Sequence, residues 1–381
     1  PETLLVAQAV LFALAAWPLF LIARELLGRP LPAVVVAVLY LIHPAILGAN
    51  FYDFHELAFT PVLFFAAYYF LLTGRMLFLW VSVALLLTVK EDMAIVVALL
   101  GAVALVTGRW RLGATLAAVG AASYGVLQGV LIPIFAGGAH SYTWYYEAMV
   151  PAGEGPSGVL TTLLMSPIQT SAHFASYPKL TYSVQLFGPL LFLAFFSRQG
   201  LILTSYGLAV ALCASREPLF QLGFQYPLVL LPMAFVGALH CLALIARTRP
   251  SLIGPLVAAM LGMSLLVAYH FGPLSGDNFR SGFRVVRLNF GAEDARRLAE
   301  VRHVAGLIPE TASVTASETL VPHVARRERL QTGRYSEERG QDYDYFFVLR
   351  SELAEATPGR FGEAYTLVYE GEFTLLYRRE T

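Results

Sequence analysis

Long apolar runs separated by short polar segments fill the chain up to residue 271. Runs of this kind are typical of helices that cross a bilayer, which need about 20 apolar residues each. Arginine, glycine and proline mark the breaks between them. The pattern predicts about ten membrane spans, at residues 4–24, 31–49, 56–73, 76–89, 93–107, 112–135, 182–197, 199–214, 224–246 and 251–270.

Three consecutive charges at residues 90–92 interrupt the apolar run Met76–Thr107. One straight helix of that length would measure about 48 Å at about 1.5 Å per residue, whereas a bilayer core is about 30 Å thick. The run therefore predicts two short helices, at 76–89 and 93–107, that meet at the charges. Charged groups at membrane depth usually face a protein interior or a water-filled cavity. The alternative is an ordinary charged turn between two short spans.

The first of these charges is Lys90, one of only two lysines among 26 basic residues. Its ammonium is a compact point charge that suits a phosphate oxygen. We therefore expect Lys90, Glu91 and Asp92 to line a polar cavity, with Lys90 in contact with a phosphate group.

Composition supports a membrane protein with a soluble part. The chain is 57% hydrophobic with a mean hydropathy of +0.62, which lies outside the ordinary globular range. Charged residues become dense after Asp277, so we predict a transmembrane domain at 1–271 and a soluble α/β domain at 277–381. The net charge is zero and no basic stripe is present, which argues against a nucleic-acid partner. Cys213 and Cys241 have no spacing typical of a disulfide or thiolate metal site.

The soluble part has its own pattern of elements. Helical spacing predicts a helix at 292–307 and a short helix at 321–327. Apolar segments at 312–316 and 345–349 predict strands. A hairpin is expected between 366–369 and 374–377.

Charges in the loops predict the orientation of the spans. Cytoplasmic loops of membrane proteins are rich in Lys and Arg. Every second loop is rich in arginine, and the other loops hold mainly acids and histidines. The arginine-rich loops are therefore expected in the cytoplasm, and the soluble domain outside it. The arginines concerned are Arg24, Arg29, Arg75, Arg109, Arg111, Arg198, Arg247 and Arg249.

One outer loop, 136–181, is long and rich in Gly, Pro, Ser, Thr and Tyr. Loops of this length often act as lids or binding loops. Its apolar stretch Val159–Met165 is expected to lie along the membrane interface as a small helix. The aromatic side chains Tyr142, Trp144, Tyr145 and Tyr146 fit a belt at the level of the lipid headgroups.

A second polar cluster, Asp53, His55 and Glu56, precedes the third predicted span. These side chains could act as acid and base, and Asp53 with His55 could bind a divalent cation if a distant residue completes the shell. The alternative for Asp53 is a helix cap. In the outer loop after residue 214, Arg216 is expected to pair with Glu217 or to contact a second phosphate. No hydrolase, Walker, zinc-protease or dinucleotide motif occurs.

Inside the second predicted span, His43 precedes Pro44. A single histidine at such a position is more often a hydrogen-bonded partner of a neighbouring helix than a metal ligand.

The order of several motifs resembles domain of unknown function 2079, a family of bacterial and archaeal membrane proteins. The relevant elements are Ala23–Arg29, Pro44, Asp53-Phe54-His55, Lys90-Glu91-Asp92 with Gly101, and Ser317–Arg327 in the tail. The resemblance covers most of the chain. It implies a multi-pass protein of a bacterial or archaeal cytoplasmic membrane, mainly α-helical, with a small extracytoplasmic α/β domain.

That family in turn is similar to the GT-C superfamily of membrane glycosyltransferases, which take a sugar from a polyprenyl-phosphate carrier at the outer face. This similarity implies a catalytic or metal-binding role for Asp53 or Glu91 and a phosphate contact for Lys90. His55 would orient the reacting groups, and the remaining candidates for substrate binding are Asp92, Glu56 and Arg216. The implied partners are membrane lipid and a lipid-linked sugar donor.

One feature leaves a second function open. GT-C enzymes usually carry an acid in a first outer loop, and the sequence begins after the place where that loop and its span would lie. The second function is a non-catalytic transporter or lipid-binding scaffold. Transporters often repeat a broken helix in both halves. No partner for the 90–92 break is found in the second half, which lowers the transporter alternative without removing it.

Overall fold

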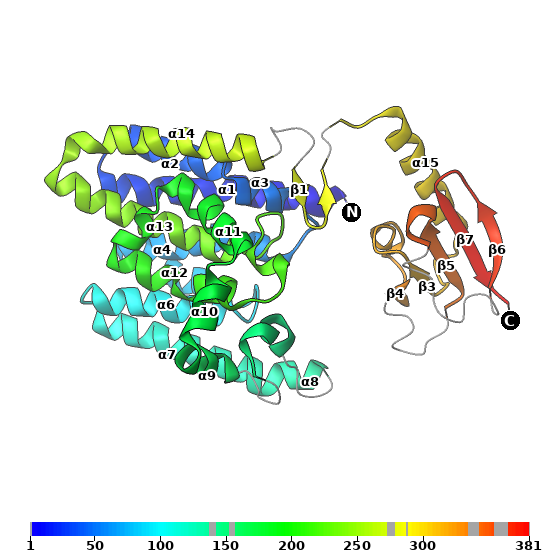
Figure 1. The fold of residues 1–381 in the computed structure, drawn as a ribbon, viewed down its shortest axis with the longest axis horizontal. Helices are drawn as coiled ribbons and strands as arrows, with labels where there is room; N and C mark the ends of the chain where they lie inside the picture. The colour runs from blue at the N-terminus through cyan, green and yellow to red at the C-terminus, as the bar shows by residue number, and fades with distance from the viewer. Residues whose placement is uncertain are drawn as a thin grey trace. The chain divides into compact units, whose positions relative to one another are not determined.

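The computed structural model describes residues 2–136, 142–151, 157–272, 279–286, 289–333, 343–353 and 365–380. The chain divides into two compact units, a helical unit, Glu2–Arg287, and a smaller unit, Leu288–Thr381. The expected boundary at Asp277 and parts of the 136–181 loop lie outside the described residues. The two units are treated separately below, and Figure 1 shows the elements of each.

The helical unit is a layered bundle (Figure 1). Several helices begin with proline at the first position, where the missing backbone N–H is not needed. The helices are α1 (Glu2–Leu27), α2 (Pro30–Leu41), α3 (Pro44–Asn50), α4 (Thr60–Thr73), α5 (Met76–Leu87), α6 (Met93–Val106), α7 (Trp110–Val126), α8 (Ile132–Ala136), α9 (Gly158–Met165), α10 (Pro167–Phe174), α11 (Tyr177–Phe187), α12 (Arg198–Cys213), α13 (Pro227–Thr248) and α14 (Ile253–Phe271).

Short helical turns and one hairpin connect these helices. A π-helical turn, η2 (Leu127–Leu131), joins α7 to α8. Two short strands, β1 (Arg280–Ser281) and β2 (Arg284–Val285), pair in antiparallel fashion. The 3-10 turns are η1 (Glu56–Phe59), η3 (Thr143–Met149), η4 (Gly188–Leu190), η5 (Leu193–Phe196), η6 (Glu217–Phe220) and η7 (Pro250–Leu252).

Fewer helices than expected are long enough to cross a membrane. Among the described residues, five segments have the length and apolarity of a span. A sixth is added if α2 and α3, which bend by 44° at their junction, form one span. The predicted number of ten is therefore not confirmed. The five segments are Glu2–Leu27, Glu56–Thr73, Trp110–Phe135, Pro227–Thr248 and Pro250–Phe271.

The span predicted at 182–197 is wrong as a single helix. Helix α11 ends at Phe187, and the chain continues through η4 and η5. Between these turns Leu191 and Phe192 have φ angles of 50° and 55°, which no right-handed helix can contain. Apolar composition alone does not reveal this break.

The α2–α3 bend occurs at His43, which caps α3. Its Nδ1 accepts a hydrogen bond of 3.2 Å from the backbone N–H of Ala45. The proton therefore lies on Nε2, which donates to the carbonyl oxygen of Leu186 at 3.1 Å. The imidazole is fully buried. The expected hydrogen bond from His43 to a neighbouring helix is present.

Helices α5 and α6 confirm the two short helices expected around the charges at 90–92. Helix α6 lies against α7 (Figure 1), and glycine permits a close approach of the two backbones. A Cβ atom at Gly101 would lie 2.6 Å from the backbone nitrogen of Ala117. At Gly120 it would lie 2.5 Å from the carbonyl oxygen of Ala94. Close packing through small residues is typical of helices in membranes.

We expect Gly120→Ala to lower the thermal stability of the purified protein, because the added methyl group would push α7 away from α6. The expected cost is about 1–3 kcal/mol, as for other overpacked contacts. Gly125→Ala is the matched control, because it lies on the same helix with nothing within 4 Å of the added Cβ. Equal melting temperatures for the two variants in detergent would contradict the proposed contact.

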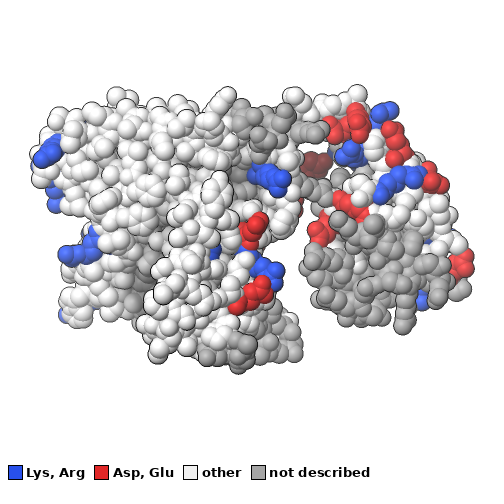
Figure 2. Space-filling model, in the orientation of Figure 1, with Lys and Arg blue, Asp and Glu red and all other residues white. Residues whose placement is uncertain are grey.

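Charge is unevenly distributed over the helical unit. Figure 2 shows basic side chains without acidic ones at one end, and basic and acidic side chains together at the other. The α6–α7 and α13–α14 connections lie at the first end (Figure 1). These connections carry Arg109 and Arg111, and Arg247 and Arg249. The distribution is the one that the loop charges predict.

The smaller unit contains a five-stranded sheet with the order β4–β3–β5–β7–β6. Strand β3 is parallel to β4 and β5, and β7 is antiparallel to β5 and β6. Helix α15 packs through Val301 and Val304 against the core of this sheet. The elements are α15 (Ala292–Leu307), β3 (Val314–Ala316), η9 (Val321–Val324), β4 (Leu330–Thr332), β5 (Tyr345–Leu349), η10 (Arg350–Glu352), β6 (Tyr365–Glu370) and β7 (Thr374–Arg379).

Most elements expected in this unit are confirmed. The helix 292–307 and the strand 345–349 have the predicted bounds. The expected hairpin forms between β6 and β7. Strand β4 was not expected, because three residues are too few to show an alternating pattern.

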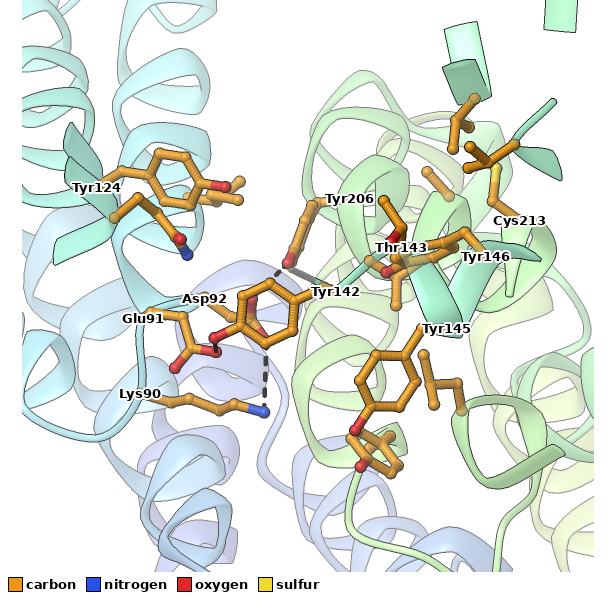
Figure 3. Close-up of a pocket in the computed structure, with 18 residues that line it drawn as sticks. Lys90, Glu91, Asp92, Tyr124, Tyr142, Thr143, Tyr145, Tyr146, Tyr206 and Cys213 are labelled. Atoms are coloured by element: carbon orange, nitrogen blue, oxygen red, sulfur yellow. Dashed lines mark hydrogen bonds and ion pairs between the residues drawn. The ribbon is translucent and has the colours of Figure 1, made fainter. Parts of the chain in front are cut away.

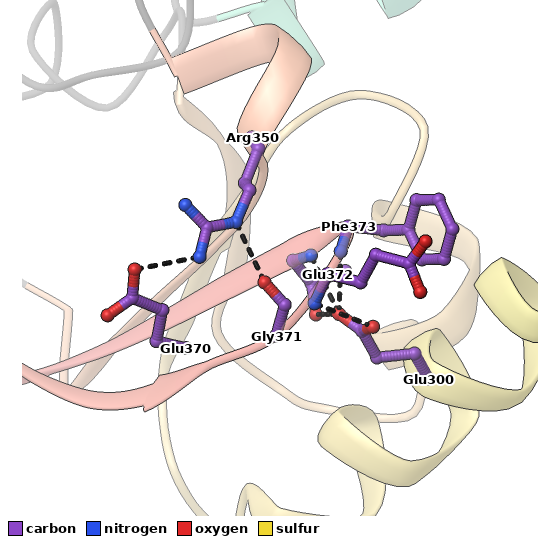
Figure 4. A network of polar contacts seen from close by, with 7 residues as sticks. Glu300, Arg350, Glu370, Gly371, Glu372 and Phe373 are labelled. Atoms are coloured by element: carbon purple, nitrogen blue, oxygen red, sulfur yellow. Dashed lines mark hydrogen bonds and ion pairs between the residues drawn. The ribbon is translucent and has the colours of Figure 1, made fainter.

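Glu300 of α15 holds the turn between β6 and β7 (Figure 4). Its carboxylate accepts hydrogen bonds from the backbone N–H groups of Glu372, Phe373 and Thr374 at 2.8–3.1 Å. The hydroxyl of Thr374 donates a further one at 2.7 Å. Burial alone would raise the pKa of Glu300, but these hydrogen bonds outweigh it and lower the pKa.

Because the pKa of Glu300 is lower in the folded unit than in the unfolded chain, its charge stabilises the fold at pH above the unfolded pKa of about 4.3. This stabilisation is lost as the pH falls through the lower, folded-state pKa. We therefore expect Glu300→Gln to weaken the hydrogen-exchange protection of β6 and β7 at pH 7 by about 2 kcal/mol. At pH 3 the difference in hydrogen-exchange protection between Glu300→Gln and the unsubstituted protein should be smaller. Glu293→Gln is the control, because Glu293 forms an exposed pair with Arg297 that contributes little. A constant difference between pH 7 and 3 would refute the role of the charge.

Candidate functional site

The charged turn between α5 and α6 lines a cavity of about 560 Å³ in the helical unit. Lys90, Glu91 and Asp92 all contribute to its surface, and all three are partly buried. The other side chains that line it are Ile95, Tyr124, Gln128, Tyr142, Thr143, Tyr145, Tyr146, Val150, Val159, Tyr206, Ala209, Val210, Cys213, Leu219 and Tyr226. A volume of this size suits a small-molecule ligand.

The cavity lies between segments that are distant in sequence. Figure 3 shows the charged turn and Tyr124 of α7 on one side, and η3 and α12 on the other. Two hydrogen bonds fix η3 to the segment after α12. The backbone N–H of Ser215 donates to the carbonyl of Tyr145 at 2.7 Å. The backbone N–H of Ala148 donates to Oγ of Ser215 at 2.9 Å.

Asp92 is the most tightly held of the three charges. The hydroxyl of Tyr206 donates a hydrogen bond of 2.6 Å to Asp92 Oδ1. Lys90 Nζ lies 3.9 Å from Asp92 Oδ2 and 5.6 Å from the centre of the Tyr226 ring. Lys90 is therefore placed by an acid and an aromatic ring while its side chain still contributes to the cavity surface.

Glu91 is held more loosely. The hydroxyl of Tyr142 donates to Glu91 Oε1 at 3.5 Å, which is long for a hydrogen bond between oxygens. Burial and the nearby carboxylates of Glu91 and Asp92 raise the pKa of Tyr142. Burial and Asp92 also raise the pKa of Tyr146, to about 12. Both phenols are therefore neutral near pH 7, and their hydroxyl groups can donate hydrogen bonds to an acceptor in the cavity.

The second polar cluster does not line this cavity. Of the described residues, Asp53 and Glu56 are exposed, and the ring of His55 stacks on Tyr52 at 5.3 Å. Burial lowers the pKa of His55, the nearby carboxylates raise it and Lys90 lowers it again, and the net result is a lowered pKa. The cluster is therefore close enough to Lys90 to interact electrostatically without contributing to the cavity surface.

A third metal ligand for Asp53 and His55 is not found. Within the described residues, no three His, Cys, Asp or Glu side chains are grouped so that they could hold a metal ion. Asp53 does not occupy the predicted cap position, because the residue that precedes η1 is His55, whose side chain forms no capping hydrogen bond.

Arg216 has a different partner from the one expected. Its Nη2 lies 3.1 Å from Glu147 Oε2, and its guanidinium lies 5.6 Å from the centre of the Trp144 ring. Glu217 instead accepts a hydrogen bond from Gln221 at 2.8 Å. The pair Arg216–Glu147 is exposed and joins η3 to the segment after α12, so among the described residues it borders the cavity without lining it.

The tyrosines around the cavity are the main feature that the sequence did not reveal. Tyr142, Tyr145 and Tyr146 were expected in a headgroup belt, and no role was assigned to Tyr206 or Tyr226. These residues come from η3, α12 and the start of α13, so only the fold brings them together. The sequence offered one weak signal, the density of tyrosine between residues 142 and 146.

The second lysine, Lys179, is buried and hydrogen-bonded within the helical unit. It is 2% exposed and donates a hydrogen bond to the carbonyl of Leu212, near the end of α12. It also contacts His173 and lies 5.2 Å from the centre of the Phe220 ring. Burial lowers the pKa of Lys179 to about 8. Lys90 is thus the lysine whose side chain lines the cavity.

Comparison with known proteins places the chain among membrane proteins. The model of a family described as "Predicted membrane protein (DUF2079)" matches residues 1–360. The matched part includes every candidate span and every residue that lines the cavity. No curated protein matches the chain.

Proposed function

Because the chain belongs to DUF2079, a family of predicted membrane proteins, we propose that it is a membrane-embedded transferase of the GT-C type. In this proposal the cavity beside the charged turn binds the phosphate and sugar of a polyprenyl-phosphate-linked donor. The sugar is passed to a hydroxyl acceptor at the outer face of the membrane.

One observation carries this proposal. A lysine and two carboxylates lie together in a cavity of about 560 Å³, at the junction of two helices of 12 and 14 residues. Helices of this length reach only about 18–21 Å at about 1.5 Å per residue, less than a bilayer core of about 30 Å. Charged groups at membrane depth are costly, so they usually face a protein interior or a water-filled cavity, and they often mark a functional site.

The distribution of arginine supports the outer location. The end of the helical unit where basic side chains predominate (Figure 2), with Glu25 as an acid beside Arg24 and Arg29, fits the cytoplasmic side. The charged turn connects to that end through the whole length of α5 and of α6. The cavity therefore belongs to the opposite, outer end, where a lipid carrier would present its headgroup.

The proposed reaction uses two groups of the turn. Glu91 takes the proton of the acceptor hydroxyl, and the oxygen forms a bond to the anomeric carbon of the sugar. The bond between that carbon and the phosphate oxygen breaks, and its electron pair leaves with the phosphate. Lys90 stabilises the charge on the departing phosphate. Asp92 and Tyr206 position Lys90 and the turn.

We place the base at Glu91 rather than at Asp53 because Glu91 lines the cavity and Asp53 is exposed among the described residues. Three other candidates, His55, Glu56 and Arg216, would then act from outside the cavity lining. His55 and Glu56 would alter the electrostatic potential at Lys90, and Arg216 would remain in its exposed pair with Glu147.

The test is turnover by the whole purified chain in lipid nanodiscs. Polyprenyl-phosphate-linked mannose and glucose serve as probes, and release of polyprenyl phosphate is measured with and without added membrane extract as acceptor. Release that depends on the protein supports the proposal. Saturable binding of both probes without any release would overturn it and favour a lipid-binding scaffold.

A further inference from the structure

The charges inside the cavity do not cancel. One ammonium, Lys90, faces two carboxylates, Glu91 and Asp92. Asp92 is close to Lys90 at 3.9 Å and accepts a short hydrogen bond from Tyr206. Glu91 has only the long hydrogen bond from Tyr142 among the described residues. One negative charge at Glu91 is therefore left for a ligand to neutralise.

Aromatic rings surround these charges. Six tyrosines line the cavity. Tyr142 and Tyr206 lie next to the charged turn (Figure 3), and their hydroxyl groups donate to Glu91 and Asp92. The face of an aromatic ring attracts a cation, most strongly where water is excluded. A carboxylate among neutral aromatic rings is a suitable environment for an ammonium group. The tyrosines are Tyr124, Tyr142, Tyr145, Tyr146, Tyr206 and Tyr226.

We propose that the ligand of this cavity carries both a phosphate, held by Lys90, and an ammonium, held by Glu91 and the tyrosine rings. This inference rests on the proposed function, which supplies the phosphate, and it adds the positive charge. Two sources have this chemistry. One is the headgroup of an amine-bearing phospholipid, and the other is a lipid-linked amino sugar phosphate.

The experiment compares pairs of small phosphates that differ in an ammonium group. Phosphoethanolamine is paired with glycerol 3-phosphate, and glucosamine 1-phosphate with glucose 1-phosphate. Affinities are measured by titration calorimetry on the whole purified chain in detergent. The proteins are the unsubstituted chain, Glu91→Gln and Glu147→Gln. Glu147 is the control because it is an acid near the cavity that does not line it in the described part of the chain.

The unsubstituted chain should bind the ammonium-bearing member of at least one pair about tenfold more tightly, the size expected for a desolvated cation on aromatic rings. Glu91→Gln should lose this preference, and Glu147→Gln should keep it. A preference in the sugar pair would assign the amino sugar, and one confined to phosphoethanolamine would assign the phospholipid headgroup.

Equal affinities within both pairs in the unsubstituted chain would overturn the inference, and this result does not depend on the folding of any variant. The proposed function would survive it, because phosphate binding at Lys90 would remain. Absence of binding for all four phosphates would overturn both. Loss of the preference in Glu147→Gln as well would assign the effect to general charge and refute the role of Glu91.

Discussion

Lys90→Ala is expected to abolish sugar transfer while the protein still folds. Lys90 is the lysine that lines the cavity, and its ammonium would neutralise the departing phosphate. Removing one fixed charge that acts on the transition state typically costs about 100- to 1,000-fold in rate. Asp92 keeps its 2.6 Å hydrogen bond from Tyr206, so the turn should retain its conformation. The measurement is release of polyprenyl phosphate in nanodiscs, together with the melting temperature in detergent.

Arg216→Ala is the matched control for Lys90→Ala. Arg216 carries the same charge in a segment bordering the cavity, but it pairs with Glu147 at the surface. We expect it to keep most of the activity. Full activity in Lys90→Ala would remove Lys90 from the mechanism. Equal losses in both variants would instead indicate that Arg216 also contacts the phosphate.

Glu91→Gln is expected to lower the turnover number by about 100- to 10,000-fold, the usual contribution of a general base. The amide has nearly the shape of the carboxylate but cannot take a proton. For a donor whose sugar carries no ammonium group, the Michaelis constant should change little, because Lys90 still holds the phosphate. Kinetics on the same nanodiscs, at saturating and limiting donor, separate the two effects.

Glu147→Gln and Asp92→Asn complete this test. Glu147→Gln should leave turnover unchanged, because Glu147 is exposed and paired with Arg216. Asp92→Asn should raise the Michaelis constant more than it lowers turnover, since Asp92 positions Lys90. If Asp92→Asn shows the large loss in turnover and Glu91→Gln does not, the base is Asp92 and the assignment to Glu91 is incorrect.

Local features of this chain could be predicted from its sequence. The turn at 90–92 follows from length, because an apolar run of that size fits neither one span nor two. The bounds of α15 and β5 follow from helical spacing and from a short apolar segment between polar ones. In each case the residues that determine the element are adjacent in the chain.

Features set by distant residues could not be predicted. The side of the cavity opposite the turn depends on hydrogen bonds donated by the backbone N–H groups of Ser215 and Ala148. No periodic pattern in the sequence indicates these bonds. The break after α11 depends on left-handed φ angles at Leu191 and Phe192, two residues with no sequence preference for them. Arg216 pairs with Glu147 rather than with its neighbour Glu217, because η3, which carries Glu147, packs beside Arg216.

The order of the three charges in the turn has an electrostatic consequence. Each helix carries a macrodipole, with a negative pole at its C-terminal end and a positive pole at its N-terminal end. Lys90 follows the C-terminal end of α5, and Glu91 and Asp92 precede the N-terminal end of α6. Each charge thus lies at the pole of opposite sign. The two helix dipoles therefore favour this order of charges over the reverse order, which would place each charge at a pole of its own sign.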